Sequence, residues 1–448
     1  MRSGSSVDYL TLKTESASLL NLFLFTLSYK FVDIRKLVDC PPVKENSYTS
    51  FGDRWIIVSS ILLQKFLLSL ANHLKMFKSM QAKIWGVSQE TYAPKVKCRD
   101  WRLEVGKNLK LGDVDNNFVY YGALTIMASA LAYQVPSVIQ TVVNNCWKMN
   151  LLKCYDFWND FQEKPTTQVF TFQNTATDPN VVVVAFRGSS EIGDWLVDVN
   201  VSWYNIEGIG HIHDGFMQAL GLQQDTDWPK DLPPRPDNHE FAYYTLRQLL
   251  RDIAKENDKA RFIITGHSLG GALAALFVTI LAFHGESALL KKLQAVYTFG
   301  QPRAGDRHFA QFMNNLTKKY GFHYYRYIYS FDMVPRVPFD FKDSWYKHFG
   351  ECVYYNSCYK GKFLEVEPNK NYFFEILVIP RKYLTAWWEL IRSLVIPLFK
   401  GPDYFEGFIR LIVRLFGLLL PGASAHMTQN YINSTRYGKI QLPLDIKP

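Results

Sequence analysis

Apolar and polar positions follow two alternating patterns through the middle of the chain, from about residue 116 to residue 367. Short runs rich in β-branched and aromatic residues predict buried strands at 180–189, 260–268, 293–300 and 323–332. Stretches with apolar residues three or four positions apart predict helices at 241–257, 269–285 and 305–321. This alternation of strands and helices predicts an α/β fold, with a largely parallel central sheet and helices on both of its faces.

The N-terminal region, about residues 1–110, is rich in Leu, Ile, Lys and Trp. Its most apolar part, residues 54–77, approaches the roughly 20 residues of a membrane span, but Gln64 and Lys65 interrupt it. Two interpretations fit equally well. The segment is either an amphipathic helix packed on the body of the protein or a helix that lies on a lipid surface.

A second apolar region covers residues 372–421 and contains four prolines that cut it into blocks, namely Pro380, Pro397, Pro402 and Pro421. In its last block Glu406, Arg410 and Arg414 recur every four residues and share one narrow helix face. The rest is almost entirely Leu, Ile, Val and Phe, and two central arginines would be costly in a membrane span. We predict a helix that lies in a lipid interface, with a helix buried in the protein as the alternative.

The composition is that of a packed globular protein, since 48% of the 448 residues are apolar and 20% are charged. The formal net charge is +9, but no dense tract of lysine and arginine accompanies it. A nucleic-acid partner is therefore only weakly supported, and attraction to an anionic lipid surface fits the charge equally well.

The chain has six cysteines, and none of them forms a C-x-x-C pair, which argues against zinc and thioredoxin-type sites. We expect reduced, structural thiols in a protein that faces the cytosol. Cys352 and Cys358 flank a predicted hairpin, and they are the pair that would bridge in an oxidising compartment.

The stretch Gly266-His267-Ser268-Leu269-Gly270 matches G-x-S-x-G between an apolar strand and an apolar helix, the pattern of a nucleophile elbow. Ser268 is predicted to sit on a strained turn that projects its hydroxyl from the sheet. Gly266 and Gly270 remove the Cβ atoms that would block such a tight strand–helix crossing. The helix that follows starts with unpaired N–H groups, which favour developing negative charge.

A serine nucleophile requires a base and an orienting acid, which follow it in the order Asp or Glu, then His. Asp332, at the end of the strand predicted at 323–332, is the predicted acid, and Asp306 is the weaker rival because it is better placed to open a helix. His348 and His426 are the two histidines after Asp332. His426 lies on a late loop and is preferred as the base, whereas His267 inside the elbow is interpreted as structural.

Two backbone N–H groups should stabilise the oxyanion, one from Leu269 after the nucleophile and one from Ser189 at the end of the segment 180–189. The next segment carries Ile192, Trp195 and Leu196 at helical spacing. These residues predict either a helix that packs on the core or a lid whose apolar face covers the serine.

Five motifs in order, "VVVVAFRGSS", "HDGF", "ITGHSLGGALA", "TFGQPRAGD" and "YSFDMVPRVP", resemble the class 3 lipases, which are fungal-lipase-like α/β-hydrolases. The resemblance covers about residues 181–338 and resumes at His426. It implies a Ser268–Asp332–His426 triad, with Ser189 and Leu269 forming the oxyanion hole. The long flanks resemble the plant triacylglycerol lipases associated with oil bodies, which have an extended N-terminal region and an apolar insertion before the catalytic histidine. This implies an N-terminal region at 1–110 and a lipase domain at 111–448, with the insertion at about 372–421.

The leading hypothesis is an interfacial carboxylester hydrolase that releases fatty acids from triacylglycerol on the cytosolic face of lipid droplets. A phospholipase A1 or a mono- or diacylglycerol lipase is the alternative within the enzyme class, and a catalytically silent lipase-like scaffold is the alternative outside it. No metal cluster or phosphate loop is present in the sequence, so no cofactor or metal is expected. The endoplasmic reticulum membrane is the second predicted location, and a true transmembrane anchor is a third hypothesis for the apolar segments.

Overall fold

The computed structural model describes residues 9–41, 48, 50–65, 69, 96–101, 114–159, 164–175, 178, 180–188, 201–220, 229–232, 239–340, 346–370, 372–373, 375–400, 406 and 408–441. Within this part of the chain the largest sheet has nine strands in the order β13-β12-β11-β10-β9-β8-β5-β4-β3. The strands are β3 (Asn150–Asn159), β4 (Lys164–Gln173), β5 (Val181–Phe186), β8 (Arg261–His267), β9 (Leu293–Phe299), β10 (His323–Tyr329), β11 (Glu351–Tyr355), β12 (Lys360–Leu364) and β13 (Lys439–Gln441). Strands β5, β8, β9, β10 and β11 run parallel to their neighbours in this group.

Strand β5 shows why these segments form the centre of the sheet. All six of its residues are buried. Val182 and Val184 belong to the core on one face of the sheet, and Val181 and Val183 to the core on the other. A strand covered on both faces must be apolar at every position, because successive side chains point to opposite faces.

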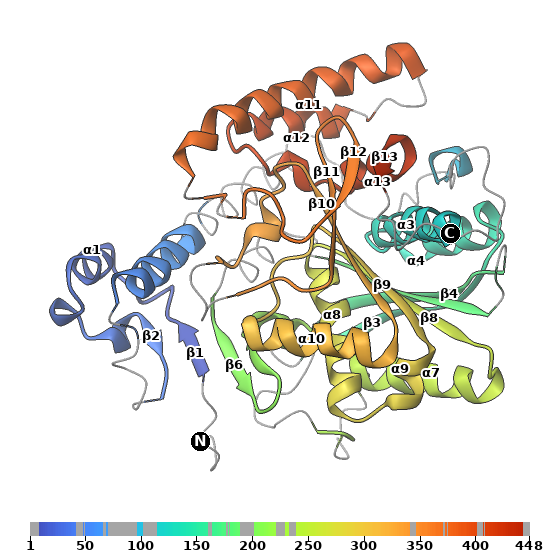
Figure 1. Ribbon diagram of the computed structural model, residues 1–448, viewed down its shortest axis with the longest axis horizontal. Helices are drawn as coiled ribbons and strands as arrows, with labels where there is room; N and C mark the ends of the chain where they lie inside the picture. The colour runs from blue at the N-terminus through green and yellow to red at the C-terminus, as the bar shows by residue number, and fades with distance from the viewer. Residues whose placement is uncertain are drawn as a thin grey trace, which may run out of the picture.

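Helices cover both faces of the sheet (Figure 1). One face carries α7 (Ala242–Glu256), α8 (Leu269–Phe283), α9 (Ser287–Lys292) and α10 (Arg307–Tyr320), and the other carries α3 (Val114–Leu131), α4 (Pro136–Gln140) and α13 (Thr428–Tyr437). Helix α10 ends as its sequence predicts, with Lys318 and Lys319 in the last turn and Gly321 in the left-handed conformation at φ +72°. This architecture confirms the predicted α/β-hydrolase fold.

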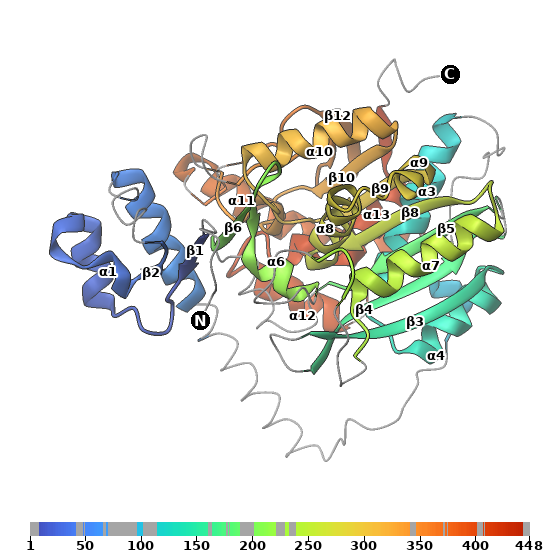
Figure 2. The same ribbon diagram turned by 90° about the horizontal axis from the view of Figure 1, so that it is seen from below.

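The N-terminal residues join a smaller sheet of order β2-β1-β6-β7. Its strands are β1 (Tyr9–Leu12), β2 (Val38–Asp39), β6 (Trp203–Ile206) and β7 (Gly210–His213). Helix α1 (Leu19–Leu27) and a helix at 51–65 lie beside β1 and β2, at one end of the molecule in both views (Figures 1 and 2). This group shares a core with Trp203 and Val337, while the predicted domain boundary at residue 110 lies outside the described residues and stays a prediction.

The second apolar region forms η7 (Ile376–Val378), α11 (Ile379–Lys400) and α12 (Phe408–Gly417), and it leads into η9 (Ser424–His426). Helix α11 continues through Pro397, so the predicted break at this proline is wrong. Pro397 lies in the last turn of the helix, so the hydrogen bond that its missing N–H removes affects only the end of the helix. Helices α11 and α12 lie together along one edge of the molecule (Figure 1).

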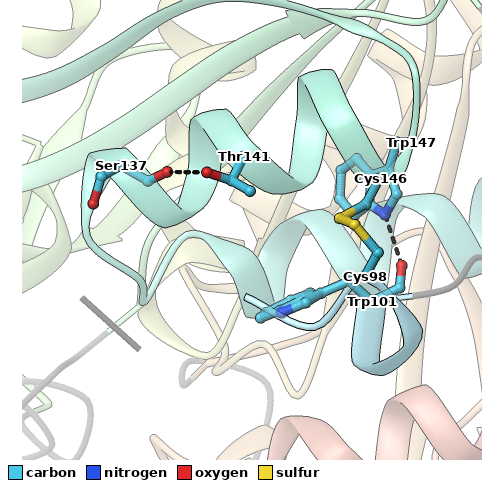
Figure 3. The surroundings of a disulfide bond; sticks show 6 residues. All are labelled: Cys98, Trp101, Ser137, Thr141, Cys146 and Trp147. Carbon is cyan, nitrogen blue, oxygen red and sulfur yellow. Dashed lines mark hydrogen bonds between the residues drawn. A yellow bond between two sulfur atoms is a disulfide. The ribbon is translucent and has the colours of Figure 1, made fainter. Parts of the chain in front are cut away.

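Two cysteines form a disulfide bond, which corrects the prediction of reduced thiols. Cys98 in η4 (Cys98–Trp101) is bonded to Cys146 at the end of η5 (Thr141–Cys146), and Trp147 Nε1 donates to Trp101 O beside it at 2.8 Å (Figure 3). Cys352 and Cys358 do not pair, because Cys352 is buried on β11 and Cys358 is exposed beyond its end. The bonded cysteines are 48 residues apart, a pairing that local spacing cannot reveal.

We expect Cys146→Ser to lower the free energy of unfolding by roughly 2–4 kcal/mol, because the disulfide restricts a long loop of the unfolded chain. Urea unfolding of the two proteins without reductant measures the difference. Cys358→Ser, which removes an exposed free thiol, is the control and should leave the urea concentration at the midpoint of unfolding unchanged. Equal midpoints for Cys146→Ser and the wild type would contradict the structural role of the bond.

Candidate active site

Ser268 occupies the sharp turn between β8 and α8, as the elbow motif predicts. Its backbone has φ +58° and ψ −133°, a region that non-glycine residues rarely adopt. A Cβ on Gly266 would lie 2.2 Å from the backbone of Gly270, and a Cβ on Gly270 would lie 2.5 Å from Phe186 O. Both glycines are therefore required for the helix to cross so close to the strands.

The structure brings the three predicted catalytic side chains into one hydrogen-bonded row. His426 Nε2 lies 2.8 Å from Ser268 Oγ, and His426 Nδ1 lies 2.8 Å from Asp332 Oδ2. All three residues are buried. Because the carboxylate can only accept, Nδ1 carries the proton that it donates to Asp332, and Nε2 is left to accept the hydroxyl proton of Ser268.

Asp332 accepts two further hydrogen bonds that its sequence position did not reveal. Val334 N donates to Oδ1 at 2.9 Å, and the Tyr431 hydroxyl donates to Oδ2 at 2.5 Å. Tyr431 comes from α13 and lies 99 positions after Asp332 in the sequence. These donors fix the carboxylate in the orientation that holds the imidazole of His426.

His267 supports His426 from behind rather than acting on the substrate, in agreement with its interpretation as structural. Its Nε2 lies 2.9 Å from His426 O, and its Nδ1 lies 2.9 Å from the hydroxyl of Tyr133. Burial, aided by the nearby His426, holds the pKa of His267 well below its usual value of 6.5. A neutral ring therefore donates from Nε2 to the backbone of His426 and accepts at Nδ1 from Tyr133.

Gly300 is a further site residue that the sequence alone did not identify. It follows β9 with φ +60°, and a Cβ at this position would lie 2.8 Å from His426 Cε1 and 2.9 Å from Asp332 Oδ2. Contacts below 3.0 Å force a rearrangement. The glycine in the "TFGQPRAGD" motif thus leaves the space that the histidine–aspartate pair occupies.

We expect Gly300→Ala to lower kcat on a soluble ester by about 100-fold, because a misplacement of about 1 Å in a catalytic group costs that much. Gly285→Ala is the matched control, since Gly285 has φ +73° and nothing within 4 Å of its added Cβ. Both variants carry the backbone penalty of a positive φ, but only one displaces His426. Equal activities of the two variants would show that the contact with the triad is unimportant.

The remaining predicted site residues divide into described and undescribed ones. Leu269 is the first residue of α8, so its N–H is among those that have no partner within the helix. Ser189 and the lid candidates Ile192, Trp195 and Leu196 lie outside the described residues, and their roles stay predictions.

The two rival residues serve other purposes. Asp306 caps α10 by accepting from Phe309 N at 2.9 Å, as its predicted role in opening a helix requires. His348 lies 2.7 Å from Pro335 O, to which its Nε2 donates. Burial and the positive charges of Arg326 and Arg303 hold the pKa of His348 below its usual value, although Glu367 opposes this effect.

A buried ionic group braces the loop that carries Asp332. Arg336 donates to Ser330 O at 3.0 Å and also to Asp332 O, and Arg303 donates to Arg336 O at 2.8 Å. Glu367 accepts from Arg303 at 2.8 Å. Although burial opposes it, the neighbouring His348 and the positive charges of Arg326 and Arg303 hold the pKa of Glu367 well below the usual 4.5.

We expect Glu367→Gln to lower the free energy of unfolding at pH 7 by about 3–5 kcal/mol, because it leaves buried arginines without their counter-charge. A lowered pKa in the folded state means that the carboxylate contributes stability above pH 4.5 and loses it as the pH falls. The difference in free energy of unfolding between the variant and the wild type, measured by urea unfolding, should therefore be smaller at pH 4 than at pH 7. The exposed neighbour Glu365 provides the control as Glu365→Gln, and a difference that stays constant with pH would contradict the pairing.

Comparison with known proteins places this geometry in a family. Residues 183–342 match the family described as "Lipase (class 3)". The chain is 33% identical to "Triacylglycerol lipase OBL1" of Arabidopsis thaliana over 97% of this chain and 96% of that protein. It is 37% identical to "Triacylglycerol lipase OBL1" of Ricinus communis over 76% of this chain and 69% of that protein.

A solved structure of the Rhizomucor miehei triacylglyceride lipase is 24% identical, covers 54% of this chain and 79% of its own, and gives a TM-score of 0.39. The Arabidopsis relative matches nearly the whole chain, flanks included, at an identity that establishes the family. The chain belongs to the class 3 lipase family.

Proposed function

We propose that the protein is a triacylglycerol lipase that works as a serine hydrolase at the surface of lipid droplets. The hydrogen-bonded row of Ser268, His426 and Asp332 at the nucleophile elbow carries this proposal. The plant relatives named triacylglycerol lipases support the substrate class.

The geometry suits acyl transfer through a covalent intermediate. Ser268 Oγ attacks the ester carbonyl carbon while His426 Nε2 takes its proton, and Leu269 N and Ser189 N stabilise the resulting oxyanion. The carbon–oxygen bond of the ester breaks as His426 returns the proton to the leaving alcohol. Water, deprotonated by His426, then attacks the acyl-enzyme, and the fatty acid leaves as Ser268 recovers its proton. Asp332 stabilises the imidazolium at both stages.

Large apolar side chains lie exposed on both flanks of the enzyme. On the N-terminal side these are Leu19, Leu20, Phe23, Leu27, Phe31, Phe51 and Trp55. On the second apolar region they include Ile376, Leu377, Leu384, Trp387, Leu398, Phe399, Leu415, Phe416 and Leu419. An apolar surface of this extent is typical of a site that binds protein or lipid. Burial in lipid would contribute roughly 1.5–3 kcal/mol for each large side chain.

Helix α12 turns a largely apolar face outward, although Arg410 near its start is also exposed. Arg414 is 1% exposed and faces the protein, whereas Phe416 is 58% exposed. A surface helix in water has the opposite arrangement. This pattern supports the predicted helix with a broad apolar face that lies in an interface.

No helix within the described part of the chain is long and apolar enough to cross a membrane. We propose that the enzyme docks on the cytosolic surface of lipid droplets, with the endoplasmic reticulum membrane as a second location. The name of the relatives, oil body lipases, supports the droplet.

Hydrolysis of a lipid panel tests the proposal. The purified enzyme is mixed with triolein droplets, diolein, monoolein and phosphatidylcholine vesicles, and released oleate is measured with Ser268→Ala as the background. The proposal requires the highest rate on triolein droplets. Preference for vesicles would indicate a phospholipase A1, preference for diolein or monoolein a partial-glyceride lipase, and background rates throughout a silent scaffold.

A further inference from the structure

Beneath the exposed face of α11 and α12 lies a set of buried polar side chains that the reaction does not use. Glu389 and Arg392 come from α11, Arg414 from α12, Glu406 from just before α12, and Asn430 from α13. Each is less than 10% exposed. We call these five residues the anchor cluster. Burial of such groups is expensive unless they are paired, so their arrangement has to be explained.

Arg414 holds the anchor cluster together. Its guanidinium donates to both carboxylate oxygens of Glu406, at 2.7 and 2.8 Å, and to Asn430 Oδ1 at 2.9 Å. A carboxylate oxygen of Glu389 lies 3.7 Å from Nη1 of the same guanidinium. The two-pronged contact with Glu406 fixes the plane of the guanidinium, and it thereby fixes the direction in which Arg414 presents its N–H to Asn430.

Arg392 makes a second connection from α11. It donates to the Tyr329 hydroxyl at 2.9 Å and lies 3.4 Å from Asn430 Oδ1. Tyr329 ends β10, three positions before Asp332. Asn430 Oδ1 therefore receives arginine N–H groups from both of the exposed helices.

The other end of the Asn430 amide reaches the catalytic histidine. Its Nδ2 donates to Ser424 O at 2.8 Å and to Ala425 O at 3.2 Å. These two carbonyls immediately precede His426, and η9 (Ser424–His426) directly follows the chain segment that leaves α12. One planar amide thus joins the arginines of α11 and α12 to the turn that carries the base.

We propose that Asn430 is a positioning residue for His426, and that the anchor cluster makes the two apolar helices part of the frame that holds the triad. This inference deepens the proposed function. The role of the outer face of the two helices in lipid docking rests on that proposed function. The inner face has a separate role. It fixes the turn at 424–426 so that His426 Nε2 meets Ser268 Oγ.

Asn430→Asp is the primary test, because aspartate keeps the shape and accepts from the arginines but loses both N–H groups that hold Ser424 O and Ala425 O. We expect kcat on p-nitrophenyl butyrate to fall about 10- to 100-fold, with KM changed less than threefold. Asn433→Asp is the matched control, since Asn433 lies on the same helix and donates to the Tyr359 hydroxyl rather than to the histidine turn. It should retain the wild-type kcat.

Labelling of Ser268 by a fluorophosphonate separates positioning from loss of fold. A displaced His426 lowers the rate of labelling while every molecule is still labelled at the end. Partial unfolding instead lowers the final labelled fraction. The proposal requires a slower rate with full labelling for Asn430→Asp. A wild-type rate, or a loss of activity that follows the labelled fraction alone, would overturn it.

Arg414→Lys keeps a positive charge beside Glu406 but loses the planar fork, so it provides a second test should Asn430→Asp fail to fold. We expect a three- to tenfold slower labelling rate, again with full labelling. A wild-type rate for this variant would overturn the proposal.

Flotation with triolein droplets tests docking independently. Asn430→Asp should float like the wild type, whereas Phe399→Ser, on the outer face, should float less and keep its labelling rate. If the wild-type enzyme hydrolysed the soluble ester but not triolein, the proposed function would be wrong. The positioning role of Asn430 would still be decided by the labelling rates.

Discussion

Ser268→Ala is expected to lower kcat by about 10⁶-fold while the protein stays folded. Alanine lacks the oxygen that lies 2.8 Å from His426 Nε2 and that forms the acyl-enzyme. The strained backbone at φ +58° is shared by serine and alanine, so the variant should keep nearly the same melting temperature.

Release of p-nitrophenol from the butyrate ester and thermal unfolding measure the two parts of this expectation. Ser129→Ala is a suitable control because it removes an equally buried hydroxyl, one that contacts Thr265 Oγ1 at 3.0 Å away from the triad. Residual activity of Ser268→Ala above one thousandth of the wild type would mean that another group is the nucleophile.

Asp332→Asn is expected to lower kcat by about 10⁴-fold, because the amide selects the wrong tautomer of His426. Val334 N–H is a fixed donor at the Oδ1 position, so the amide oxygen must remain there. The amide NH₂ then faces His426 Nδ1, which can only accept from it. The ring proton moves to Nε2, where it points at Ser268 and prevents the ring from accepting the hydroxyl proton.

The same ester assay, with circular dichroism to verify the fold, measures this effect. Asp306→Asn is the control that tests the rival acid directly, because asparagine is also a good helix cap and should leave kcat within about twofold. If Asp306→Asn lost activity and Asp332→Asn did not, the catalytic acid would be Asp306 and not Asp332.

Local sequence patterns were sufficient for the elements around the elbow. The apolar runs of β5 and β8 and the glycines at 266 and 270 each reflect a steric need that acts within a few residues. The order of serine, aspartate and histidine along the chain then narrowed the candidate base to His348 or His426. The structure places His426, and not His348, beside Ser268.

The parts that could not be predicted depend on contacts between distant segments. Tyr431 and Gly300 belong to the site because α13 and the end of β9 meet at Asp332, and no local period encodes that meeting. Likewise, the charged stripe of α12 was visible in the sequence, but the stripe alone does not say whether it faces water or protein. Arg414 faces protein because Glu406 and Asn430 are there to receive it.

The outward apolar face of α11 and α12 also bears on how the enzyme is distributed in a cell. If the enzyme docks on lipid as proposed, a detached molecule would present Leu398 and Phe399 to water at more than 80% exposure, and such an apolar surface would favour association between detached molecules. The area of available lipid would then set how much enzyme stays dispersed and active. A cell that consumes its stored oil would, by shrinking that area, also withdraw the lipase that consumes it.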